Sequence, residues 1–269
     1  MSGPDYGIEQ PNGARVYNAL IGGKDNYEAD RRVQFMLVEL CPSLPRTLWR
    51  ARDFVESTAR RLVVTGVRQF VDLGAGFPRD GDALAQLRVL APDSTLVSLD
   101  NDVLVNAHGR ALLPPRTVVV DADYTNGVEL TKALDCELDL TKPVAVILAS
   151  VLDHLARPTD LLETLGAILV PDSYLVITHL GSDLLSDPTA VAAVFEGAGM
   201  PLFPRDRVEL RALLDGFDVQ KVDVVPADSL VPNAEPLAVA TTATISSYGA
   251  VARILGPVES SQREKESRI

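Results

Sequence analysis

Short apolar runs alternate with segments of helical spacing over the middle of the chain. The runs that predict buried strands are residues 69–73, 95–99, 117–120, 144–149 and 174–178. The segments that predict helices follow them, at residues 82–90, 103–113, 125–134, 159–169 and 205–214. Strands that alternate with helices in this way predict an α/β fold with a parallel sheet and crossover helices.

The pattern changes after the fifth strand. Residues 217–225 and 246–255 predict two further strands, and a loop containing Pro226, Pro232 and Pro236 separates them without an evident helix. Two late strands joined by a loop favour an antiparallel pair at one edge of the sheet.

Residues 1–65 precede the first strand and predict a separate helical cap. Helices are expected at residues 29–40 and 46–64, and residues 22–27 form a turn rich in hydrogen-bonding groups. This turn is either a capped helix end or a lid over a ligand. The expected organisation is a lid and cap at 1–65, a sheet domain at 66–256 and a charged, disordered tail at 257–269.

A glycine turn and a carboxylate end the first two predicted strands. Asp72 precedes Gly74 and Gly76, and Asp100 ends the next strand. Glycines let backbone approach a ligand closely, and an acid at the neighbouring strand end can accept both hydroxyls of a ribose. A dinucleotide site needs a third glycine where this chain has Arg79. The pattern therefore favours S-adenosylmethionine over a nicotinamide dinucleotide.

Composition narrows the classes of partner. The chain has a formal net charge of −12, which disfavours a nucleic-acid partner despite several arginines between residues 46 and 61. The sequence has neither a secretory leader nor an apolar run long enough to span a membrane, so a cytoplasmic protein without membrane partners is expected. Cys41 and Cys136 lack metal-ligand spacing, and no metal site is expected.

Several segments resemble a bacterial family of S-adenosylmethionine-dependent methyltransferases, found mainly in actinomycetes and long catalogued as a domain of unknown function. They are residues 12–30, 69–78, 100–108, 120–123, 173–179 and 248–253. The resemblance implies a Rossmann-like class I methyltransferase fold with a seven-stranded, mostly parallel sheet, an antiparallel edge pair and an N-terminal helical cap. It also implies a role in natural-product biosynthesis.

The resemblance assigns roles to residues at the donor site. It places Asp72, Gly74 and Gly76 at the methionine end of S-adenosylmethionine, Asp100 at the ribose, and Asn101, Asp121 and Ala122 at the adenine, with Ala75 and Ser150 as further contacts. The lid would comprise Gly22, Gly23, Lys24, Asn26 and Tyr27. Arg79 stands where the family has a threonine-containing turn and is a candidate partner of the methionine carboxylate.

Methyl transfer from a sulfonium needs alignment and, for many acceptors, removal of a proton. The candidate bases are His154, His179 and Asp153, and Tyr17 is a candidate for orienting the acceptor. A histidine at a strand end is more often structural, and Tyr17 can equally pack the cap.

The sequence is thus interpreted as a methyltransferase of a small molecule, expected to be a secondary metabolite. The product would be S-adenosylhomocysteine, and the methyl group would pass in line to oxygen, nitrogen or an electron-rich ring carbon such as indole C3. The alternative is a non-catalytic S-adenosylmethionine-binding regulatory or scaffold protein. The cap also offers a surface for a homodimer.

Overall fold

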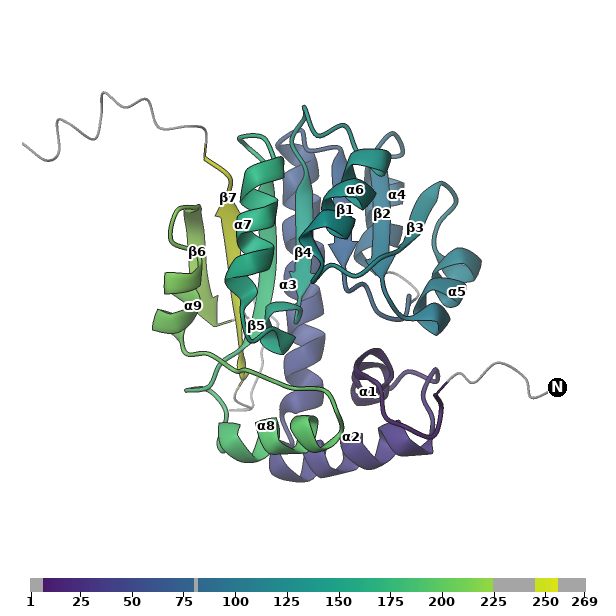
Figure 1. Cartoon of the computed structure of the whole chain (residues 1–269), viewed down its shortest axis with the longest axis vertical. Coiled ribbons are helices and arrows are strands. Elements are labelled where there is room, and N and C mark those ends of the chain that lie inside the picture. The colour runs from purple at the N-terminus through teal and green to yellow at the C-terminus, as the bar shows by residue number, and fades with distance from the viewer. Residues whose placement is uncertain (1–6, 80–81, 225–244, 256–269) are drawn as a thin grey trace, which may run out of the picture.

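A seven-stranded sheet forms the centre of the computed structural model, which describes residues 7–79, 82–224 and 245–255 (Figure 1). The strand order is β3-β2-β1-β4-β5-β7-β6. The strands are β1 (Gln69–Leu73), β2 (Thr95–Asp100), β3 (Thr117–Asp121), β4 (Ala145–Ala149), β5 (Tyr174–Leu180), β6 (Asp218–Val224) and β7 (Ser247–Arg253). The first five pair in parallel, and β7 runs antiparallel to both β5 and β6. The predicted parallel sheet and antiparallel edge pair are confirmed.

Helices connect these strands close to the predicted bounds. They are α1 (Gly13–Leu20), α2 (Glu28–Leu40), α3 (Leu44–Val64), α4 (Ala83–Leu90), α5 (Val103–Leu112), α6 (Gly127–Glu137), α7 (Pro158–Ile168), α8 (Pro188–Gly197) and α9 (Arg207–Leu213), with a 3₁₀ turn η1 (Leu152–His154). The sequence analysis did not predict α1 and α8. Both begin at a side-chain cap, because Asn12 accepts from the Arg15 amide and Asp187 from the Ala190 amide.

The sheet buries both faces, as its nearly continuous apolar strands require. Successive residues of β1 point to opposite sides: Val71 packs under α6 and α7, whereas Phe70 packs against α3 and α4. Helices α6, α7 and α9 therefore cover one face, and α3, α4 and α5 lie at the other (Figure 1).

A separate apolar cluster forms beyond the carboxyl ends of the parallel strands, where α1, α2 and α8 lie together (Figure 1). Val16, Leu37 and Phe195 are buried in it. The start of α3 joins this cluster through Leu48, and the rest of α3 packs on the sheet. The predicted N-terminal cap is thus present, and α3 belongs to both cap and sheet. A domain boundary at residue 65 stays a prediction.

Two sequence predictions fall outside the described residues. They are the proline-containing loop with Pro226, Pro232 and Pro236, and the charged tail at 257–269.

Candidate active site

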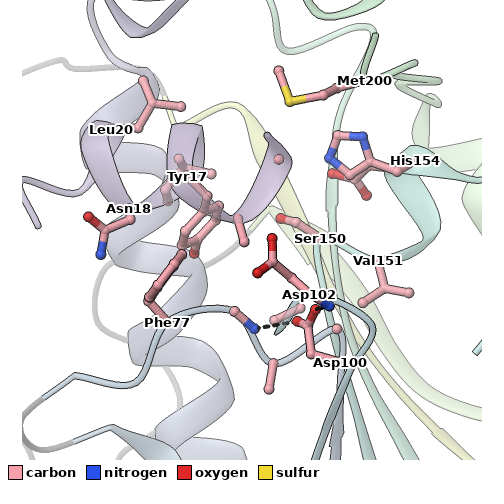
Figure 2. Close-up of a pocket in the computed structure, with 18 of the residues that line it drawn as sticks. Tyr17, Asn18, Leu20, Phe77, Asp100, Asp102, Ser150, Val151, His154 and Met200 are labelled. Carbon is pink, nitrogen blue, oxygen red and sulfur yellow. Dashed lines mark hydrogen bonds between the residues drawn. The ribbon is translucent and has the colours of Figure 1, made fainter. Parts of the chain in front are cut away.

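A cavity of about 540 Å³ lies between the carboxyl ends of the parallel strands and the cap. Its floor comes from the residues that follow β1, β2 and β4, and its walls come from α1, α3, α8 and the segment 199–202. Figure 2 shows Tyr17 and Leu20 of α1 on one side of this space and His154 and Met200 on the other.

The turn after β1 leaves the floor of the cavity open. Gly74 and Gly76 have φ values of +62° and +65°, which residues other than glycine rarely adopt. A Cβ on Gly74 would lie 3.2 Å from Val151 Cγ2 and 3.3 Å from Tyr124 Cε1, whereas one on Gly76 would enter open space. The glycines therefore allow a ligand to lie directly against the backbone.

The Asp100 carboxylate is fixed at the end of β2 by two backbone amides. Gly76 donates to Oδ2 at 2.9 Å and Asp102 donates to Oδ1 at 2.9 Å (Figure 2). Burial raises the pKa of Asp100, and these hydrogen bonds oppose the rise. Each carboxylate oxygen keeps a further lone pair, so both remain able to accept ribose hydroxyls.

Asp72 adds a second carboxyl group to the cavity. Burial raises its pKa from the usual 3.8 to about 8, although the positive charge of Arg52 opposes the rise. This raised pKa favours the protonated form of Asp72 at neutral pH, even with the Arg52 guanidinium nearby.

The other end of the cavity is mainly apolar and contains one imidazole. Leu20, Phe195, Met200 and Leu202 line it together with His154. The His154 Nδ1 lies 2.8 Å from the carbonyl oxygen of Pro201. Because a carbonyl only accepts, Nδ1 carries the proton and Nε2 presents a lone pair. This is the tautomer that a general base needs.

His179 has a different environment. Its side chain is fully buried and does not line the cavity. Nδ1 donates to the Leu180 carbonyl at 2.9 Å, and Nε2 accepts from Arg205 at 3.1 Å. Both ring nitrogens are engaged, so His179 holds the end of β5.

Asp153 lines the cavity while its side chain is fully buried. Oδ2 accepts from the Leu180 amide at 3.1 Å, and the Asp153 carbonyl oxygen accepts from the Phe203 amide at 2.7 Å. These contacts fasten η1 to β5 and to the segment that carries Pro201. Asp153 thereby fixes the position of His154.

The glycine-rich turn after α1 is built around Asn18. Its Oδ1 accepts from the Asp25 amide and from Asn26 Nδ2, both at 3.0 Å. A Cβ on Gly23 would collide with the side-chain amide of Asn18, so this position requires a glycine. Asn18 lines the cavity; the predicted lid residues, which are Gly22, Gly23, Lys24, Asn26 and Tyr27, do not.

The structure brings most of the other predicted residues together. The cavity lining includes Tyr17, Asp72, Gly74, Ala75, Gly76, Asp100, Asn101, Ser150, Asp153 and His154. Asp121 ends β3 beside Asp100 and Ala122 follows it; neither lines the cavity, and the Ala122 amide donates to the Asp100 carbonyl. Arg79 also lies outside the lining.

Several lining residues were not predicted from the sequence. They are Asn18, Arg52, Tyr124, Phe195, Met200 and Leu202. The spacing of Leu48, Arg52, Val55 and Glu56 places them on one helical face, but only the structure shows that this face borders the cavity.

Residues 7–79, 82–224 and 245–255 contain neither a cluster of metal ligands nor a membrane-spanning helix. No group of three or more His, Cys, Asp or Glu side chains is arranged to hold a metal ion. In the same residues, every helix is too short or too polar to cross a lipid bilayer.

The donor end fits S-adenosylmethionine by its own chemistry. The glycine turn leaves room for a ligand against the backbone, Asp100 offers acceptors to ribose hydroxyls, and Asp72 can pair with an ammonium group. This arrangement is the one expected from the first two strand ends.

Comparisons with known proteins agree with this geometry. A family model described as S-adenosyl methyltransferase matches residues 3–255. A DUF574 family protein from Streptomyces avermitilis has a TM-score of 0.84 and 27% identity, with 93% of this chain and 99% of that chain covered. A methyltransferase candidate from Thermobifida fusca YX has a TM-score of 0.84 and 26% identity, with coverages of 95% and 100%.

The fold also extends to more distant enzymes. The plantazolicin methyltransferase BpumL, solved with a triazolic desmethylPZN analogue and SAH, has a TM-score of 0.53 and 13% identity over 90% of this chain and 96% of that chain. No curated protein matches the sequence at a significant level. The chain belongs to the S-adenosyl methyltransferase family and is a methyltransferase that uses S-adenosylmethionine as its cofactor.

Proposed function

We propose that this methyltransferase acts on a small, largely apolar molecule, a secondary metabolite, and methylates an oxygen, a nitrogen or an electron-rich ring carbon. The observation that carries the proposal is the second end of the cavity. It places the His154 imidazole, with a lone pair on Nε2, among the apolar side chains of Leu20, Phe195 and Met200.

The size and cover of the cavity support a small acceptor. Helices α1 and α8 lie over the strand ends and contribute walls to the acceptor end of the cavity (Figure 1). Cavities of this size usually bury most of a drug-sized ligand. The net charge of −12 disfavours a nucleic-acid acceptor.

Bound S-adenosylmethionine supplies an activated methyl group. The residues of the protein then align the acceptor with that methyl group, and one of them takes up the proton that the acceptor loses. Asp100 and the glycine turn hold the donor at one end, and the apolar wall orients the acceptor at the other. His154 takes the proton on Nε2 as the new bond forms, while the Pro201 carbonyl stabilises the resulting imidazolium through Nδ1.

The position of His154 favours catalysis over a purely donor-binding scaffold. A scaffold has no need for an imidazole of fixed tautomer in a cavity that continues beyond the donor end. Tyr17 also lines the cavity from α1.

The proposal is tested by incubating the parent protein with S-adenosylmethionine and a panel of small aromatic alcohols, amines and indoles, and measuring S-adenosylhomocysteine. We expect release that depends on one chemical class of acceptor and is absent in Asp100→Ala. Donor binding without turnover across the panel and across extracts of a producing bacterium would support the scaffold alternative.

A further inference from the structure

The arginine expected to hold the methionine carboxylate is engaged elsewhere. The Arg79 guanidinium stacks over the Trp49 ring at 4.2 Å from its centroid and lies 3.6 Å from a carboxylate oxygen of Glu56. Arg79 does not line the cavity. The donor carboxylate therefore needs another partner.

The lining of the cavity is rich in acids and poor in bases. Its carboxyl groups are Glu56, Asp72, Asp100, Asp102 and Asp153. Among the described lining residues, Arg52 is the only lysine or arginine. A ligand carboxylate that enters this cavity has one cationic side chain to meet.

Arg52 is placed and charged for that task. It lies on α3 next to Asp72 and Tyr17, and its guanidinium carbon is 5.8 Å from the Tyr17 ring centroid. Burial alone would lower the pKa of Arg52, but the Tyr17 hydroxyl and the Asp72 carboxyl more than offset this effect, and the pKa is raised. Within the described residues no carboxylate lies within ion-pair distance of Arg52, so part of its hydrogen-bonding fork remains available.

We infer that Arg52 binds the α-carboxylate of the methionine part of S-adenosylmethionine, and that Tyr17 is its positioning residue. A guanidinium binds a carboxylate through two parallel hydrogen bonds, which gives both affinity and orientation. Asp72 lies beside it and pairs with the α-ammonium group.

This arrangement links the cap to the donor. Tyr17 belongs to α1, whereas Arg52 belongs to α3 and Asp72 to β1. The donor's amino-acid end thus lies where three elements meet, and its binding would hold α1 against the sheet.

Two ligands distinguish carboxylate binding by Arg52 from a general effect of Arg52 on the shape of the cavity. S-adenosylhomocysteine carries the amino-acid group, and 5′-methylthioadenosine has the same nucleoside without it. Calorimetry with both ligands needs no acceptor, so its outcome is independent of the proposed substrate.

We expect Arg52→Gln to weaken S-adenosylhomocysteine binding by about 10- to 100-fold, as for the loss of hydrogen bonds to a charged group. Binding of 5′-methylthioadenosine should stay at the parental level. Arg52→Lys, which keeps the charge and removes the planar fork, should fall between parent and Arg52→Gln. Tyr17→Phe should weaken only S-adenosylhomocysteine, by a smaller factor.

Arg79→Gln is the matched control and should bind both ligands like the parent. A selective loss of S-adenosylhomocysteine in Arg79→Gln, with Arg52→Gln unaffected, would return the role to Arg79. Equal losses of both ligands in folded Arg52→Gln and Arg52→Lys would show that Arg52 only supports the pocket.

Discussion

Asp100 is expected to accept hydrogen bonds from the ribose hydroxyls of the donor. The backbone amides of Gly76 and Asp102 already orient its carboxylate. Asp100→Ala should weaken S-adenosylhomocysteine binding by about 1.5 to 3 kcal/mol for each charged hydrogen bond lost. Calorimetry measures this effect, and Asp135→Ala on the exposed side of α6 is the control. Parental affinity in a folded Asp100→Ala protein would remove the ribose assignment.

Asp72 makes stability depend on pH through its raised pKa of about 8. Below the usual carboxyl pKa of 3.8 both folded and unfolded chains hold the proton. Between pH 3.8 and about pH 8 only the folded chain keeps the proton on Asp72. Raising the pH therefore lowers the free energy of unfolding by at most about 1.4 kcal/mol per pH unit in this range. Above pH 8 this contribution of Asp72 to the free energy of unfolding no longer changes.

Asp72→Asn lacks this titration. Its stability advantage over the parent, measured by urea denaturation without ligand, should therefore be larger at pH 8 than at pH 5. An advantage that is equal at both pH values would mean that the Asp72 carboxyl is ionised throughout.

His154 should matter for turnover and little for donor binding. Replacing it by Ala removes the base, and we expect turnover to fall by about 10² to 10⁴ with S-adenosylhomocysteine affinity nearly unchanged. Steady-state rates with the true acceptor and calorimetry give the two readouts. Near-parental turnover in His154→Ala would assign proton loss to water, to Asp153 or to a tyrosine.

Helix α1 lines the cavity, and the turn after it extends from α1 toward α5. Asn18 organises the turn, and Asp25 Oδ1 lies 3.3 Å from His108 Nε2, so the turn reaches α5. Helix α1 packs mainly on α2 within the cap cluster, away from the main core of the sheet. We propose that this element opens to admit ligand and closes on the bound donor.

Ligand should therefore protect residues 13–27 from proteolysis. Limited proteolysis with and without S-adenosylhomocysteine, read by mass spectrometry, should show slower cleavage in this segment than in the α6–α7 region. Cleavage at the same rate in both conditions would make α1 and its turn a fixed part of the cap.

The elements that the sequence predicted well are those with strong periodic signals. Runs such as residues 144–149 and 174–178 are almost entirely apolar on both faces, as is typical of buried parallel strands. Helices α1 and α8 escaped prediction because they stand outside the regular alternation of strand and helix. Their apolar residues fill the cap cluster around Leu37 and Leu48 rather than packing on the sheet. Their caps, Asn12 and Asp187, were the available signals.

At the scale of the whole molecule, topology explains which site residues could be foreseen. Asp72, Gly74 and Asp100 end adjacent parallel strands, whose carboxyl ends meet at one edge of the sheet. Arg52 could not be placed in this way, because its position depends on how α3 crosses the sheet and meets α1. The separate roles of Arg52 and Arg79 likewise depend on tertiary packing around Trp49.

One cavity is expected to hold the donor on the strand ends and to leave its other end for the acceptor. A crystal structure with bound S-adenosylhomocysteine is the decisive measurement. We expect the ribose hydroxyls on the Asp100 carboxylate, the amino-acid end between Asp72 and Arg52, and the sulfur facing the space before His154. Ligand bound elsewhere, or with its sulfur turned away from the apolar end, would show that the cavity does not join donor and acceptor in this way.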